Sequence, residues 1–180
     1  MKKKPLIKNV LVFVLVLSFT IGVILGAVSY CYIPDALLNE TEKLVSLNLD
    51  YKRNFYNIYF QNMFSEFIWV ISVWGMGYFS NTTLFTASLL ALRGYFIGFG
   101  SAFFTTLGKT YSNVFLSSII SQAIIIMPFF TCFSALCAEY GNAVKTKNKN
   151  SYVVLGGVYI FLTFVVVLAE TFLGALFISF

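Results

Sequence analysis

Charged residues are scarce in this chain, and histidine is missing altogether. Only 11% of the 180 residues are charged, against about 25% in soluble domains. Because histidine is the commonest general base and metal ligand, its absence excludes zinc intramembrane proteases built on paired histidines. We therefore expect no bound metal.

Phosphate-binding motifs are also missing. The sequence contains neither a Walker loop nor a Gly-rich dinucleotide motif, so we expect no ATP hydrolysis and no cofactor. The three cysteines are Cys31, Cys132 and Cys137. The last two are five residues apart on one predicted helix and do not face each other, which argues against a structural disulfide. With no nucleophile–base pair in the sequence, we expect a protein that is not an enzyme.

Apolar sequence is what the chain has in abundance, since 59% of its residues are hydrophobic. A bilayer core requires about 20 apolar residues per helix. Five stretches near that length fill the chain, at 10–33, 63–79, 82–107, 114–140 and 152–180. The sequence therefore predicts one all-α, polytopic membrane domain over 1–180, with five transmembrane helices. Its surroundings would be the lipid bilayer, with no nucleic acid as a partner.

The N-terminal lysines and the apolar run after them resemble a secretory signal. The sequence at Ala27-Val28-Ser29 would permit cleavage, but a run of about 24 residues is long for a signal, so we expect an uncleaved first helix. Basic residues in short loops mark the cytoplasmic side. With the N-terminus inside, the cytoplasmic basic residues are Lys2, Lys3, Lys4, Lys8, Lys145, Lys147 and Lys149, and the external ones are Lys43, Lys52, Arg53 and Lys109. This distribution predicts a cytoplasmic N-terminus and an external C-terminus.

The only sizeable predicted loop is 34–62, which would lie outside. Leucines recur in it at helical spacing with carboxylates between them, which predicts an amphipathic helix on the outer surface. The aromatic residues in 55–60 resemble an anchor before the second span. The segment is either a plain membrane-bound connector or a docking surface for an extracytoplasmic partner. The candidate docking residues are Leu37, Leu38, Glu40, Glu42 and Leu44.

Arg93 is the residue that most needs an explanation. It lies midway along the predicted third span, where an arginine costs about 2.5–3.5 kcal/mol on insertion scales. Its candidate partners are Glu66, Glu139 and Glu170. We favour Glu170, because it and Arg93 both lie well within apolar runs. The alternatives are a substrate or ion pathway, and a side chain that snorkels to the inner surface.

Small and helix-breaking residues indicate how the predicted helices pack. Pro128 should kink the predicted fourth span, in which Gln122 can hydrogen-bond a neighbouring helix. Two Gly-x-x-x-Gly motifs permit close helix contacts. They consist of Gly22, Gly26, Gly94 and Gly98. We expect these motifs to pack within the chain rather than to form a dimer.

Five segments, taken in order, resemble stage II sporulation protein M. They are 21–28, 74–77, 92–99, 121–128 and 169–171. The most recognisable is 92–99, in which Arg93 and Gly94 are followed by Gly98 and Phe99. The resemblance implies a polytopic protein on the mother-cell side of the sporulation septum. It would be a non-enzymatic scaffold that recruits peptidoglycan-degrading enzymes, an amidase/endopeptidase and a lytic transglycosylase, during engulfment.

A second hypothesis follows from the residues alone. The chain could be a small permease or transporter subunit in which Arg93 and Glu170 line a pathway. A water-filled cavity that reaches Arg93 would favour transport. A dry, ion-paired Arg93 would favour the scaffold.

Overall fold

Long apolar runs interrupted by few glycines and prolines favour helices throughout this chain. The computed structural model describes residues 4–34, 36–40, 43, 55–79, 81–106, 121–144 and 149–178. Within these residues the regular secondary structure is helical and includes no strand. The all-α prediction is therefore confirmed for the part of the chain that the structure describes.

Five long helices and one π-helical segment form the bundle, and residues 36–40 are also helical. The elements of the bundle are α1 (Lys4–Tyr30), α3 (Phe55–Met76), α4 (Thr82–Thr106), η1 (Gln122–Ile126), α6 (Met127–Val144) and α7 (Lys149–Ile178). The main difference from the prediction is α3, which begins at Phe55 rather than at 63. The aromatic residues of 55–60 therefore belong to its first turns and not to a segment before it. Residues 107–120, which include the start of the predicted fourth span, lie outside the described residues.

Four helical stretches among the described residues are long and apolar enough to cross a bilayer. They are Val10–Tyr30, Thr82–Thr106, Gln122–Tyr140 and Asn150–Leu173. α3 is not among them, although its 22 residues extend about 33 Å at 1.5 Å per residue. Its first half carries Asn57, Gln61 and Asn62, which lower its hydropathy over a stretch of membrane length. α3 nevertheless packs in the same bundle, against α4, α6 and α7.

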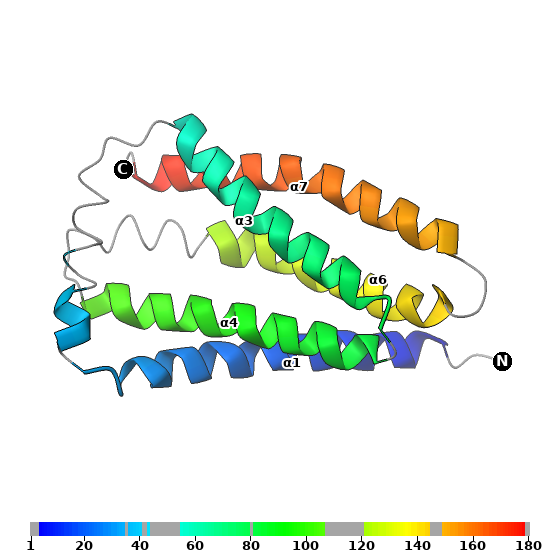
Figure 1. Ribbon diagram of the computed structural model, residues 1–180, viewed down its shortest axis with the longest axis horizontal. Helices are drawn as coiled ribbons and strands as arrows, with labels where there is room; N and C mark the ends of the chain where they lie inside the picture. Colours follow the sequence, from blue (N-terminus) through cyan, green and yellow to red (C-terminus); the bar gives the residue numbers. More distant parts are fainter. Residues whose placement is uncertain are drawn as a thin grey trace.

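The long helices alternate in direction along the chain (Figure 1). α1, α4 and α7 run one way, and α3 and α6 run the other way. The start of α1 therefore lies at the same end of the bundle as the α3–α4 turn and the end of α6. The end of α7 lies at the opposite end.

The helices pack as two pairs with α6 between them. α1 packs most extensively on α4, α3 packs on α7, and α6 contacts all four. The shared core contains Leu15, Val70, Val73, Leu90, Ile126, Phe130, Phe133, Cys137 and Tyr152. Large apolar side chains also cover the outside of the bundle, where Phe13, Leu84 and Phe161 are 66%, 64% and 69% exposed. An apolar exterior of this kind suits lipid rather than water.

Candidate functional site

The two glycine motifs join α1 to α4. A Cβ atom added to Gly22, Gly26, Gly94 or Gly98 would overlap the backbone carbonyl oxygen of Ala91, Tyr95, Phe19 or Val23, respectively. The motifs therefore face each other within the chain, and each helix admits the backbone of the other. Because successive helical residues are about 100° apart around the axis, Arg93 points to a different side of α4 from Gly94. That side faces α3 and α6.

Arg93 forms a buried ion pair with Glu66. Its Nη2 donates a hydrogen bond to Glu66 Oε1 at 2.5 Å. Both residues are only 4% exposed, and Glu66 lies near the middle of α3. Charge-assisted bonds of this type are among the stronger hydrogen bonds in proteins. The pair therefore links α3 to α4 inside the bundle.

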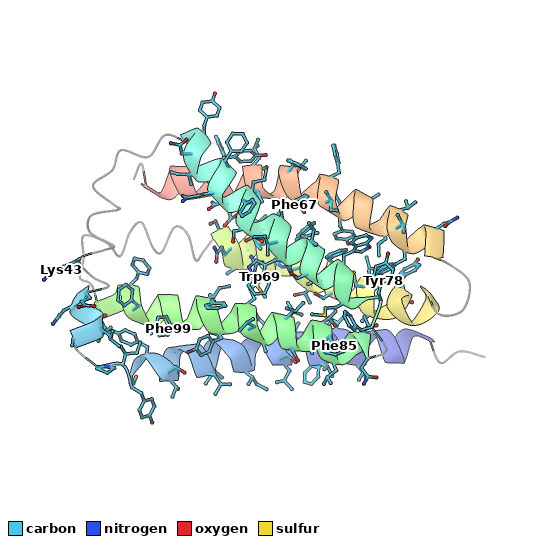
Figure 2. All side chains as sticks on the ribbon, viewed as in Figure 1. Lys43, Phe67, Trp69, Tyr78, Phe85 and Phe99 are labelled. Carbon is cyan, nitrogen blue, oxygen red and sulfur yellow. The ribbon has the colours of Figure 1, made fainter. Side chains whose placement is uncertain are left out.

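Two aromatic rings enclose the guanidinium group of Arg93. The Phe130 ring of α6 has its centroid 4.2 Å from the guanidinium carbon, and the Trp69 ring of α3 lies at 5.5 Å. Figure 2 labels Trp69 in the middle of the bundle. Ring faces carry negative partial charge, which attracts a cation. α3 and α6 thus both contribute to holding the Arg93 charge.

Glu170 is not the group to which Arg93 is bonded, so the predicted ion pair between them is wrong. Glu170 is buried on α7, where it is 3% exposed. It lies close enough to interact electrostatically with both Arg93 and Glu66, and its hydrogen-bonding neighbour is the Gln122 side chain. Glu139, the third candidate, is exposed on α6. The structure therefore brings Arg93, Glu66, Glu170 and Gln122 together, with a different pairing from the one expected.

The start of α3 explains this difference. A second span beginning at 63 would place Glu66 near its first residues, whereas a helix beginning at Phe55 places Glu66 near its middle. α3 and α4 are antiparallel neighbours joined by a short turn around Phe79. Glu66 and Arg93 are almost equally far from that turn along the chain, so they lie at the same depth. That near-equal spacing is the sequence signal that identifies the pair.

Pro128 acts on its helix through the π-helical segment η1. The backbone N–H of Met127 bonds the carbonyl oxygen of Gln122, five residues earlier. A proline ring clashes with the carbonyl four residues before it and donates no N–H, and a π turn is one way for a helix to accommodate such a break. The wider turn carries Gln122, whose side chain is the neighbour of Glu170. Pro128 itself is exposed.

Several buried polar atoms of this cluster have no hydrogen-bond partner. In the described part of the chain they are Glu66 Oε2, Glu170 Oε2, Arg93 Nε and Arg93 Nη1. Buried polar groups are normally satisfied. The cluster also holds two carboxyl groups against one guanidinium group. Its arrangement is therefore closed to solvent, incompletely bonded and unequal in charge.

A second interhelical contact, between Trp74 and Tyr152, was not predicted from the sequence. The Tyr152 hydroxyl donates to the backbone oxygen of Trp74 at 2.6 Å, and the Trp74 indole N–H donates to the backbone oxygen of Tyr152 at 3.3 Å. Gly77 and Gly156 provide the room, since an added Cβ would overlap Tyr152 or Trp74. This reciprocal contact fixes the end of α3 on the start of α7. The sequence signal that could have predicted this contact is the presence of aromatic residues near the adjacent ends of the two helices.

The proposed docking residues are only partly described. Residues 36–40 are helical, with Leu37 and Glu40 exposed and Leu38 half-buried. Glu42 and Leu44 lie outside the described residues, so the amphipathic helix stays a prediction beyond residue 40.

Neither a disulfide nor a metal cluster is found among the described residues. All three cysteines are free thiols. No group of three or more acidic or cysteine side chains in the described ranges is placed to hold a metal ion. Comparison of the chain with protein-family models, curated proteins and solved structures gives no match.

Proposed function

We propose that all five long helices span the membrane, with α3 as the fifth span and the start of α1 in the cytoplasm. The alternating helix directions support this proposal, since each long helix then crosses in the opposite sense to the one before it. Basic residues support the orientation. The start of α1 and the end of α6, beside the lysines of 145–149, lie at one end of the bundle (Figure 1), and Lys43 lies at the other (Figure 2).

Within this topology we propose a non-enzymatic membrane scaffold. It recruits peptidoglycan-degrading enzymes at the sporulation septum during engulfment, from the mother-cell membrane. The observation that carries the proposal is the burial of Arg93 in an ion pair between helices, beneath two aromatic rings. A buried charge that needs its partner on another helix ties the two helices together, because removal of either partner is strongly destabilising. The resemblance of segments such as 92–99 to stage II sporulation protein M supplies the class of partner.

The outer segment 34–54 is the proposed docking surface. The long helices use their surfaces on one another and on lipid, so an external partner has few other places to bind. Leu37 is 54% exposed, and Glu40 is exposed beside it. An apolar residue flanked by a carboxylate provides both contact area and charge selection for a partner. The partners proposed are an amidase/endopeptidase and a lytic transglycosylase.

Replacement of this segment tests the scaffold proposal. Residues 36–54 are exchanged for a neutral linker of equal length, which leaves α3 intact from Phe55. Fluorescent wall hydrolases are then localised in sporulating cells, beside the membrane level of the variant. We expect normal membrane levels and loss of septal recruitment. Charge reversal by Glu40→Lys should weaken recruitment, whereas Glu139→Lys, at the other end of the bundle, should not. Normal recruitment with the linker would refute the docking surface.

A second candidate function is a small permease. The unpartnered Oε2 of Glu170 and the π-helical turn beside it favour this candidate, because both occur at intramembrane transport sites. The test is reconstitution of the purified chain in liposomes with a pH-sensitive dye inside. Proton or solute flux that Glu170→Gln abolishes would favour transport over the scaffold.

A further inference from the structure

The buried cluster around Arg93 has more negative than positive groups. Glu66 and Glu170 are 4% and 3% exposed, and Arg93 is the only basic residue between Arg53 and Lys109 in the sequence. If both carboxyl groups were ionised, the cluster would hold one uncompensated negative charge in the bundle interior. An isolated buried charge is costly, and such groups neutralise instead. Among the described residues, the cluster therefore lacks one positive charge.

The two carboxyl groups differ in how their charge is held. Glu66 receives a charge-assisted hydrogen bond from Arg93 at 2.5 Å, which stabilises its ionised form. Glu170 has a neutral amide, that of Gln122, as its hydrogen-bonding neighbour, and its Oε2 has no partner. The unmatched negative charge would therefore fall on Glu170.

We propose that the Arg93–Glu66–Glu170 cluster is a binding site for one proton, carried by Glu170 while Glu66 remains ionised against Arg93. A proton needs no ligands beyond the carboxyl oxygen. A metal cation of the Ca²⁺ or Mg²⁺ type is normally held by several carboxylates, and no group of three or more acidic or cysteine side chains among the described residues is placed to hold one. Proton binding leaves the cluster with one carboxylate and one guanidinium group, which are equal and opposite.

The groups that act on Glu170 come from several elements. The charged groups are Glu66 on α3 and Arg93 on α4, and the polar group is Gln122 on η1. The cysteines of α6 that lie toward α7, Cys132 and Cys137, instead act on Tyr159 and Tyr152. In the part of the chain that the structure describes, α1 makes no contact with α7. Among the described residues, the charge state of Glu170 thus depends on the Arg93–Glu66 pair and the neutral amide.

The bound proton links stability to pH. At neutral pH a glutamate in the unfolded chain is ionised, so the folded chain binds one proton more than the unfolded chain. Stability then falls as pH rises, because the state that binds more protons is favoured at low pH. We expect the melting temperature of the purified full chain to fall as the pH rises from about 5 through neutral pH, because the unfolded glutamate is already ionised over this range while the folded one loses its proton. Glu170→Gln, which resembles the protonated group in shape and charge, should remove most of that fall.

Infrared spectroscopy of the chain in nanodiscs detects the proton directly. At neutral pH the wild type should show the C=O stretch of a protonated carboxyl group, with a shift in heavy water. Glu170→Gln should lose this band, and Glu139→Gln, which changes an exposed glutamate of α6, should keep it. Glu170→Asp, which keeps a carboxyl group, should show the band at a shifted frequency. This variant separates loss of the carboxyl group from misfolding caused by any change at residue 170.

Three outcomes would overturn the proposal. The first is a wild-type protein with no protonated carboxyl band at neutral pH. The second is a band that persists in Glu170→Gln. The third is a protein that lacks the band and is stabilised by sodium chloride but not by choline chloride at equal ionic strength. The site would then hold a metal cation in place of the proton. The proposal does not depend on recruitment of wall hydrolases or on transport, and the infrared result is independent of both assays.

Discussion

Arg93 and Glu66 are less costly to bury as an ion pair than either charge would be alone. Bringing two charges into a low-dielectric interior is costly, and their attraction offsets that cost only while both are present. The Trp69 and Phe130 rings add a contribution that depends on the arginine alone. Removal of one charge therefore exposes the penalty of the other.

Arg93→Leu should destabilise the chain by about 3–5 kcal/mol, because it leaves Glu66 buried without a counter-charge. Arg93→Leu combined with Glu66→Gln should recover part of that loss. The measurement is thermal unfolding of the purified variants in detergent, arranged as a double-mutant cycle. A cycle in which Glu170→Gln, and not Glu66→Gln, rescues Arg93→Leu would contradict the pairing seen here.

The contact between α1 and α4 rests on glycines that no larger residue can replace without moving a helix. At Gly22 and Gly98 the atoms in the way are backbone carbonyl groups, which cannot rotate aside as a side chain would. Close backbone approach of this kind replaces the hydrophobic driving force that is absent between helices in lipid.

Gly22→Ala and Gly98→Ala should each destabilise the chain by about 1–3 kcal/mol, the usual cost of overpacking. Gly75→Ala on α3 is the matched control, because a Cβ there meets nothing within 4 Å. Disulfide trapping between cysteines placed on α1 and α4 measures the separation of the two helices. Equal behaviour of Gly22→Ala and Gly75→Ala would exclude close α1–α4 packing.

The α3–α7 contact allows a smaller and sharper test. Tyr152→Phe removes the hydroxyl that donates to Trp74 while keeping the stacked ring. The Trp74 carbonyl oxygen also accepts from Gly77 N–H, so it is not left unsatisfied, and we expect a loss of about 1 kcal/mol. Unfolding followed by tryptophan fluorescence measures it. Tyr32→Phe, at a residue 82% exposed, should have no effect, and an equal effect of both changes would refute the role of the Tyr152 bond.

The bundle as a whole predicts on which side of the membrane each loop lies. With Cys31, Cys132 and Cys137 replaced by serine, a cysteine introduced at Lys43 should react with a membrane-impermeant thiol reagent in intact cells. A cysteine at Lys147 should react only after the cells are opened, because basic loops stay on the cytoplasmic side. Labelling of the residue-147 variant in intact cells would show that the proposed orientation is wrong.

Which residues form helices, and which of them need partners, could be predicted from the sequence because these properties are local. Apolar runs of membrane length predicted helices close to α1, α4 and α7, and glycine spacing predicted close packing. Arg93 was expected to need a counter-charge, a pathway or access to the surface wherever its helix lay, because a lone charge in lipid is costly. None of these statements requires knowledge of which helices are neighbours.

The tertiary structure decided which groups meet. Glu66 rather than Glu170 bonds Arg93 because α3 and α4 form an antiparallel hairpin in which the two residues lie almost equally far from the turn, and therefore at one depth. The near-equal spacing of Glu66 and Arg93 from the turn indicates a common depth, but which carboxyl group turns toward Arg93 depends on how the helices pack. The same packing left Glu170 with a neutral amide in place of a counter-charge, and only a fold that places three helices around one arginine produces that excess of negative groups.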